Sequence, residues 1–272
     1  MTASSALRCH ALAAPIALAL ALTVLAPAPA AAQSGPEIMQ KYRQVHRLKD
    51  EEERLLLKLV SKTGGVKERR VVRWTMNGAG DLDKILIRFL APRDVENTAL
   101  LTWEAKDGND DQWLYLPATK KPKRIAASGK KNRFMGTDFT YEDLRPENTA
   151  VHTYTVTGTE AIEGQPCWVI ESLPATEREA ADTAYSKRRL WIRKDTYTLV
   201  KREYHDKQGR LEKIELQRKH VNVGGTAWRP DELEMQDVQN GSSTVLIVER
   251  RAVDRGLKDD FFSEVELTRG GS

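Results

Sequence analysis

The side chains best able to do chemistry in this sequence lack the spacing of a catalytic or metal-binding motif. After residue 32 the histidines are His46, His152, His205 and His220. They show none of the short ligand spacings of zinc sites. No G-x-S-x-G motif marks a nucleophilic serine. The run Tyr204-His205-Asp206 could orient a general base, but the Gln208-Gly209 that follows favours a hairpin turn.

Two groups of mainly acidic residues also suggest chemistry. They are Asp107, Asn109 and Asp111 in the first group and Asp138, Glu142 and Asp143 in the second. The first group begins a calcium-loop pattern but lacks its later glycine and distal glutamate, so we interpret it as a hairpin turn. The second group could act as paired carboxylates, but nothing around it indicates a sugar-binding site. A short helix capped by Thr137 or Asp138 is the simpler interpretation. We therefore predict no enzyme activity, no metal and no cofactor.

A basic segment rich in aromatic residues, Trp113–Leu144, carries the strongest functional signal. Cations beside exposed aromatic side chains suit a lipid with an anionic head group and an apolar tail. We predict that its ligand-binding residues are Trp113, Tyr115, Phe134, Met135, Phe139 and Tyr141. We predict that a head group or partner contacts Lys123, Arg124, Lys130, Lys131 and Arg133. An ordinary solvated surface is the alternative interpretation of the cationic run.

The first 32 residues predict export. Arg8 and His10 precede an apolar run, 11–26, which is shorter than the roughly 20 residues that a membrane-spanning helix needs. Three alanines at 30–32 are small residues of the kind that precede a signal-peptidase site. We therefore predict a cleaved signal peptide over 1–32 and a periplasmic mature protein, with a retained anchor as the alternative.

The mature chain, 33–272, is expected to fold as a single domain and to be a monomer, because about 240 residues suffice for one sizeable core. Its formal charge falls from +4 to +3, since Arg8 is the only charged residue removed. Acidic and basic residues are interspersed, so we predict no nucleic-acid partner. Cys167 is then the only cysteine. Its apolar neighbours predict a buried thiol rather than a nucleophile.

The periodicity predicts one helix followed by many strands. The helix spans 36–49, with an apolar stripe formed by Ile38, Met39, Tyr42 and Val45. From residue 53 onward, β-like runs alternate with turn signals such as Asn77-Gly78 and Asn240-Gly241. Short connections predict antiparallel neighbours, so the fold class is mainly β, a meander of about ten or eleven strands. A sheet this wide must curl, and we expect the helix to lie across its mouth.

One strand shows which face of this sheet should be apolar. Between residues 84 and 90, Ile85, Ile87 and Phe89 alternate with Leu86, Arg88 and Leu90. Successive side chains of a strand point to opposite faces. We therefore predict that Ile85, Ile87 and Phe89 face the core or a ligand space, while the other face of the sheet is wet.

Several motifs together resemble a known family. They are FLAP, TWE, WLYLP, KPKRI, the block FMGTDFTYEDL at Phe134–Leu144, YSKRRLWI, EYHDKQGRLEK and FFSEVEL. In this order they resemble the outer-membrane lipoprotein-sorting proteins of the LolA-like superfamily, over nearly all of the mature chain. The resemblance implies an incomplete, half-open antiparallel β-barrel closed by one or more short helices. It also implies an apolar cavity for acyl chains, and an association with inner-membrane lipid exporters.

Two functions follow from these observations. The first is a periplasmic carrier that holds a lipid or lipoprotein acyl chain, contacts membranes transiently and works with an inner-membrane exporter. The second is a non-carrying adaptor that docks on a membrane transporter through the basic loop. The sequence favours the carrier and leaves the adaptor open.

Overall fold

The structure is a computed structural model that describes residues 1–2, 33–108 and 110–270. Within these residues the chain is mainly β, with thirteen strands in one antiparallel sheet. The strands are β1 (Asp50–Val60), β2 (Val66–Asn77), β3 (Asp83–Ala91), β4 (Ala99–Trp103), β5 (Asp111–Tyr115), β6 (Pro122–Arg124), β7 (His152–Ile162), β8 (Gln165–Pro174), β9 (Lys187–Arg193), β10 (Leu199–His205), β11 (Leu211–Gly224), β12 (Ala227–Asp237) and β13 (Ser242–Val253). The predicted signal peptide and Asn109 fall outside the described residues, apart from Met1 and Thr2.

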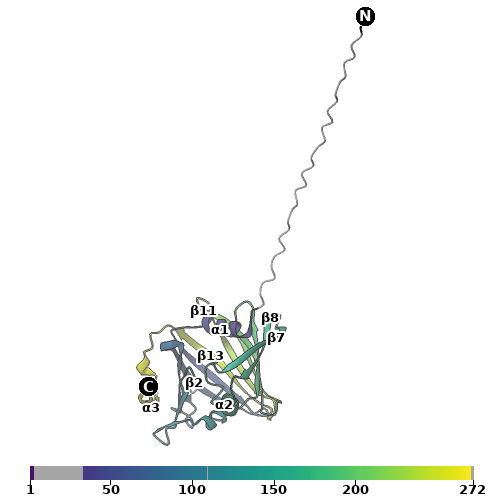
Figure 1. Ribbon diagram of the computed structural model, residues 1–272. Helices are drawn as coiled ribbons and strands as arrows, with labels where there is room; N and C mark the ends of the chain where they lie inside the picture. Colours follow the sequence, from purple (N-terminus) through teal and green to yellow (C-terminus); the bar gives the residue numbers. More distant parts are fainter. Residues whose placement is uncertain (3–32, 109, 271–272) are drawn as a thin grey trace. The chain divides into compact units, whose positions relative to one another are not determined.

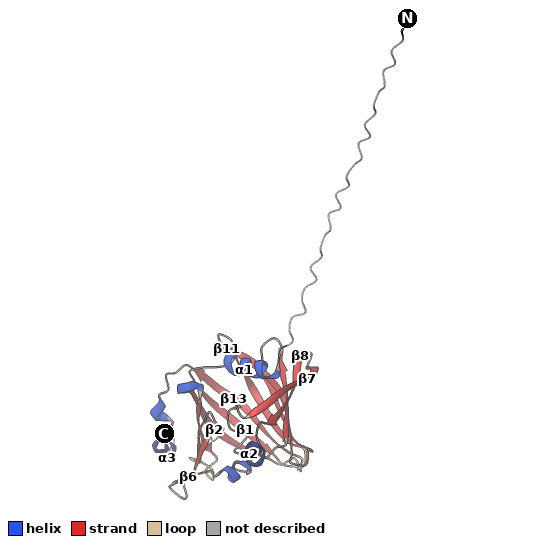
Figure 2. Ribbon diagram, in the orientation of Figure 1, coloured by secondary structure: helices blue, strands red, loops and turns tan. Residues whose placement is uncertain are grey.

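The strands follow one another as a meander in each half of the sheet, and the first strand, β1, pairs with the last, β13, in the middle. The order of the sheet is β6-β5-β4-β3-β2-β1-β13-β12-β11-β10-β9-β8-β7. Among the described strands the edges β6 and β7 do not pair with each other, so the curved sheet is a half-open barrel (Figure 1, Figure 2). The predicted count of ten or eleven strands was too low. One reason is that β6 has only three residues, begins with a proline, and lies inside the cationic run.

Short helices accompany the sheet. They are α1 (Gly35–Val45), α2 (Glu177–Asp182) and α3 (Glu264–Thr268), with 3-10 helices at Ala79–Asp81, Ala127–Lys131 and Asp259–Phe261. The predicted helix is present as α1, but it ends at Val45 rather than at residue 49. Ser34 and Glu37 form a capping box at its start. In Figure 1, α1 and α2 lie at opposite ends of the curved sheet.

The apolar stripe of α1 packs on the sheet. Ile38 and Met39 are fully buried against a cluster that includes Ile170, Leu190 and Ile192 of β8 and β9. Beyond the last turn, the Thr226 hydroxyl donates to the Val45 carbonyl oxygen, 2.7 Å away. The helix is therefore packed on β7–β10 along its apolar stripe, and its last residue is hydrogen-bonded to Thr226, which precedes β12.

The alternation predicted for β3 is present. Ile85, Ile87 and Phe89 belong to one buried cluster, and Leu86 belongs to another on the opposite face. We call the face that carries Phe89 the inner face of the sheet. The prediction that the other face is wet was wrong here, because Leu86 is fully buried and Arg88 is only 3% exposed.

A C-terminal segment covers this outer face. Phe262 and Leu267 pack on Leu86, and the Trp103 indole N–H donates to the Phe262 carbonyl oxygen at 2.8 Å. Arg88 donates to the Glu266 carbonyl oxygen at 2.6 Å. The 3-10 helix Asp259–Phe261 and α3 thus cover the outer face of β3 and β4, so both faces of these strands are buried.

Candidate functional site

The segment between β6 and β7 enters the inner side of the curved sheet. We call residues 127–148 the inserted segment. Phe134 and Phe139 are joined by a backbone hydrogen bond of 2.8 Å, and an isolated bridge joins Arg133 to Thr140. The tip of the segment, around Phe134, is therefore a tight turn pointed at the sheet.

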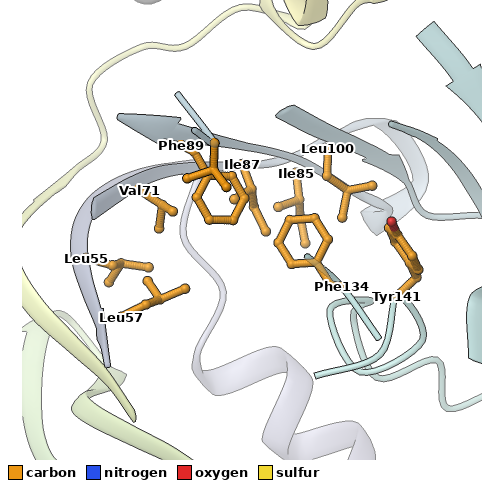
Figure 3. Packing of buried hydrophobic residues seen from close by; sticks show 10 residues of the cluster. Leu55, Leu57, Val71, Ile85, Ile87, Phe89, Leu100, Phe134 and Tyr141 are labelled. Carbon is orange, nitrogen blue, oxygen red and sulfur yellow. The ribbon is translucent and has the colours of Figure 1, made fainter. Parts of the chain in front are cut away.

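Apolar side chains of the sheet meet the inserted segment in one cluster (Figure 3). The cluster consists of Leu55, Leu57, Val71, Ile85, Ile87, Phe89, Val95, Leu100, Phe134 and Tyr141. The Phe134 ring lies 5.6 Å from that of Phe89 and 5.5 Å from that of Tyr141. These are the centroid distances at which aromatic rings attract one another. Phe134 is 3% exposed, so the segment closes this apolar surface.

Of the predicted ligand-binding residues, Ile85, Ile87, Phe89, Phe134 and Tyr141 come together in this cluster. Met135 packs on its rim as a partly buried side chain. Phe139 belongs to a neighbouring inner cluster that contains Tyr185, Tyr204 and Met235.

Trp113 and Tyr115 are placed elsewhere. Both pack in the outer cluster with Leu86, Phe262 and Leu267. Trp113 pairs with Leu101 in the register of β4 and β5, and cross-strand partners share a face. These two predicted ligand-binding side chains therefore lie on the opposite face of the sheet from Phe89, since one step along a strand reverses the face.

Polar groups anchor the inserted segment to the far half of the sheet. Asp138 accepts hydrogen bonds from Ser242 and Thr244 of β13, at 2.6 and 2.7 Å. Asp143 accepts from Lys213 of β11 at 2.9 Å and from the Tyr185 hydroxyl at 2.7 Å. The prediction of a short helix in Phe134–Leu144 was wrong, because this block forms turns. The carboxylates of Asp138 and Asp143 bind the sheet instead of capping a helix.

Glu142 and Glu147 extend this anchoring. Glu142 accepts from Arg188 of β9 at 2.7 Å. Glu147 accepts from the Tyr154 hydroxyl at 2.6 Å. Burial alone would raise the pKa of Glu147, but the charges of Arg202 and Arg188 outweigh burial and hold it at about 2. The sequence contained no sign of these contacts. Apart from Tyr154 and Glu147, the two residues of each contact lie 41 or more positions apart.

Most of the predicted head-group cations already have partners within the fold. Lys130 donates to the Asp110 carbonyl oxygen at 2.6 Å, and Lys131 donates to that of Ala181 at 2.7 Å. Arg133 forms ion pairs with Asp138 and Asp237, and Arg124 with Asp111. Lys123 is exposed on β6. The loop is therefore partly structural and partly an exposed cationic edge.

The residues considered for other chemistry have structural roles. Asp111 of the calcium-like pattern begins β5 and forms an ion pair with Arg124. The adjacent Asp110 carboxylate accepts hydrogen bonds from the Ala105 backbone N–H and from Arg145, at 2.8 and 2.6 Å. The Asp206 carboxylate accepts from the Gln208 and Arg210 backbone N–H groups, which is a hairpin turn as predicted. Cys167 is fully buried as predicted, and burial raises the pKa of its thiol.

A polar cavity of about 290 Å³ lies beside the apolar cluster, at the end of the sheet that α1 covers. Tyr42, Arg43 and His46 of α1 form one wall. Arg73 and Thr75 of β2 contribute another. Further lining residues come from β10–β12 and include Leu199, Gln217, Trp228, Arg229 and Leu233.

Solved structures of other proteins share this architecture. A domain classed among outer membrane lipoprotein-sorting proteins, from Vibrio parahaemolyticus, is 31% identical over 86% of this chain and 98% of its own, with a TM-score of 0.82. The chain belongs to the outer-membrane lipoprotein-sorting protein family. A DUF1329 family protein from Desulfovibrio piger is 28% identical over 86% of this chain and 97% of its own, with a TM-score of 0.80.

One more distantly similar structure shows the same fold. A LolA superfamily protein from Nitrosomonas europaea is 19% identical over 85% of this chain and 98% of its own, with a TM-score of 0.67. A family model described as “Uncharacterized protein” matches residues 81–269. No curated protein matches the sequence. Within residues 33–108 and 110–270, no helix has the length and apolar character needed to span a membrane.

Proposed function

We propose that this chain is a periplasmic carrier that holds the acyl chain of a lipid or lipoprotein on the inner face of its half-barrel. The observation that carries the proposal is the closed apolar cluster in which Phe89 of the sheet meets Phe134 of the inserted segment. Membership of a family that includes a lipoprotein-sorting domain supports the same conclusion. The mature domain, 33–272, would act as a soluble monomer after removal of residues 1–32.

The acyl chain would bind where the inserted segment now packs. Ile87 is 7% exposed and Phe89 is fully buried, so their surface becomes available when Phe134 moves away. An acyl chain would then replace one apolar contact with another, which limits the free-energy cost of opening. Phe139, Met135 and Tyr141 would contact the chain from the displaced segment.

Exposed cations of the loop would guide the encounter with a membrane or partner. Lys123 and its neighbours Lys120 and Lys121 are exposed at the β6 edge. Anionic lipid surfaces attract such side chains at about 1 kcal/mol each. Transfer toward the outer membrane would begin at an inner-membrane exporter that supplies the lipid. The adaptor alternative draws less support, because Lys130, Lys131 and Arg124 already bind groups of the same chain.

Two experiments test the carrier function. Native mass spectrometry of protein purified from its own envelope should show a co-purifying lipid, whereas repeatedly empty protein would support the adaptor. A reversible lock tests the site itself. The Asp138 backbone N–H lies 3.0 Å from the Thr244 hydroxyl oxygen, so a disulfide between Asp138→Cys and Thr244→Cys should hold the segment closed.

We expect the oxidised double variant to lose uptake of a fluorescent acyl probe and to regain it on reduction. Each single cysteine variant is the matched control, since it loses the same polar contact without a cross-link. Equal uptake in the oxidised and reduced forms would show that the segment does not need to move.

A further inference from the structure

The inner face of the sheet is divided along the strands into a polar and an apolar half. On β1, Glu51 and Glu53 precede Leu55 and Leu57 on the same face. On β2, Arg73 pairs in register with Glu53, and Val71 with Leu55. Two residues along the strand, about 7 Å, therefore separate the Arg73–Glu53 ion pair from the apolar cluster. This division matches the two ends of an amphiphile.

The polar half contains the cavity of about 290 Å³ described above. Leu233 lines this cavity and pairs in register with Leu246. Leu246 in turn packs on the apolar cluster of Phe89 and Phe134. A continuous apolar row thus leads from the cavity to the proposed acyl site.

The charges of the cavity are already compensated. Arg43 pairs with Glu104 at 2.7 Å, and Arg229 pairs with Glu51 at 2.8 Å. Arg73 forms an ion pair with Glu53. The Asp50 carboxylate accepts three backbone N–H groups, from residues 255–257. Asp83 accepts a hydrogen bond from Asn77 at 3.0 Å and has no ion pair with a described residue, but the positive charges of Arg43 and Arg47 act on it. The lining carries four cationic and four anionic side chains, so an added net charge would unbalance it, and the desolvation of that charge would cost free energy.

Hydrogen-bonding capacity nevertheless remains at the wall. The Tyr42 side chain lines the cavity, and its hydroxyl has no hydrogen-bond partner among the described residues. Paired guanidinium groups keep further N–H donors, because each carries five. The lining therefore suits a group that accepts hydrogen bonds without bringing net charge.

We propose that this cavity binds the head group of the cargo amphiphile, that the head group carries no net charge, and that Tyr42 donates a hydrogen bond to it. The inference rests on the proposed carrier function and orients its ligand. The head group lies under α1, and the acyl chain extends toward Phe89 and Phe134. The exposed loop lysines serve the encounter rather than the bound head group.

Three single-chain probes with equal dodecyl chains test the head-group preference below their micelle concentrations. They are dodecyl phosphocholine, which is zwitterionic, dodecyl glucoside, which is uncharged, and dodecyl sulfate, which is anionic. The full mature chain should bind the first two more tightly than the sulfate. Tighter binding of the sulfate would overturn the proposal.

Substitution of Tyr42 tests the hydrogen bond. Tyr42→Phe should weaken binding of the phosphocholine and glucoside probes by about threefold to tenfold, as expected for one hydrogen bond, and should leave the sulfate probe unchanged. Tyr197→Phe is the matched control. Tyr197 and Tyr42 both pack on the cluster of Ile38 and Met39, but the Tyr197 hydroxyl donates to Gln33 at 3.1 Å on the surface. Equal effects of the two variants would contradict the role of Tyr42.

Photo-crosslinking tests the orientation and separates this inference from the carrier function. A diazirine in the head group should label residues 42–48 or 228–233, and a diazirine at the chain end should label 85–89 or 134–141. Head-group labelling at 120–133 would overturn the head-group site while the carrier function stands. Failure of every probe, including a fluorescent fatty acid, to bind would instead overturn the carrier function.

Discussion

Lys213 Nζ lies 2.9 Å from the Asp143 carboxylate, with the two side chains 2% and 1% exposed. Lys213 belongs to β11 and Asp143 to the inserted segment, so this ion pair joins the segment to the sheet. Burial alone would raise the pKa of Asp143, but the charge of Lys213 and hydrogen bonds from Thr140 and Tyr185 lower it overall. The segment is therefore held by charge at one end and by apolar packing at the other.

Removing the lysine should destabilise the protein strongly. Lys213→Ala leaves a buried carboxylate without its counter-charge, which typically costs about 3–5 kcal/mol of unfolding free energy. Lys219→Ala is the control on the same strand, because Lys219 forms a 2.7 Å pair with Glu232 while 68% exposed. That variant should change the unfolding free energy by about 1 kcal/mol or less. Urea denaturation measures both, and similar losses would contradict the structural role of Lys213.

Both faces of β3 should be sensitive to truncation. Phe89→Ala should lower the unfolding free energy by about 3–5 kcal/mol, and Leu86→Ala by about 2–5 kcal/mol, because each side chain is fully buried. Val66→Ala, at a position 55% exposed, should change it by about 0.5 kcal/mol or less. A small loss for Leu86→Ala would show that α3 does not cover the outer face in solution.

Sequence reasoning succeeded where a short-range pattern determines the structure. The alternation Ile85-Leu86-Ile87 and turns such as Asn240-Gly241 indicate strands and their connections. The pattern did not indicate which face of β5 carries Trp113, because adjacent apolar side chains pack on both faces, Trp113 in the outer cluster and Leu114 in the inner one. Nor could it indicate partners far apart in the sequence. Arg133, for example, pairs with Asp237, and it looked like a free surface cation.

Deleting residues 36–47 should expose the surface that α1 covers. Ile38 and Met39 are fully buried against Ile170 and Leu190, so their loss would present these side chains to water. We expect stronger fluorescence of a hydrophobic dye and a lower melting temperature. Lys41→Ala, on the exposed side of α1, should change neither quantity. Unchanged dye binding in the deletion would mean that the helix is a free tether.

Two charge reversals in the basic loop should have different effects. Lys121→Glu with Lys123→Glu alters exposed cations, and we expect slower association with anionic vesicles at low salt, with no change in melting temperature. Lys130→Glu with Lys131→Glu should lower the melting temperature, because both ammonium groups bind carbonyl oxygens of the fold. Added salt should shrink the difference in association rate between the parent and the Lys121→Glu, Lys123→Glu variant. A difference that persists at high salt would exclude simple electrostatic guidance.

Phe134→Ala with Phe139→Ala tests the apolar contact proposed for the acyl chain. Uptake of a fluorescent acyl probe should weaken at every salt concentration, because apolar contact is not screened. The measurement requires variants shown to be folded, since the two rings are 3% and 4% exposed. Trp113→Ala is the matched control, because Trp113 packs on the outer face. Equal uptake by all three proteins would remove the inserted segment from the ligand site.

The stability of the α1 end should depend on pH through His46. Burial, together with the nearby charges of Arg229 and His220, lowers the pKa of His46 to about 4, although backbone carbonyls of 196 and 197 oppose this. In the unfolded chain the imidazole titrates near 6.5. The unfolded state therefore binds a proton that the folded state excludes between about pH 6.5 and pH 4, so stability is lost as the pH falls through this window.

His46→Gln removes this contribution and isolates it from the other titrating groups. The imidazole Nδ1 accepts from the Trp228 backbone N–H at 3.2 Å, and the glutamine amide oxygen can take over that role. The difference in unfolding free energy between parent and variant should be largest at pH 7 and should narrow by about 1–2 kcal/mol by pH 5. Urea denaturation at matched ionic strength measures the difference at each pH. A constant difference would mean that His46 keeps an ordinary pKa and that water reaches it beneath α1.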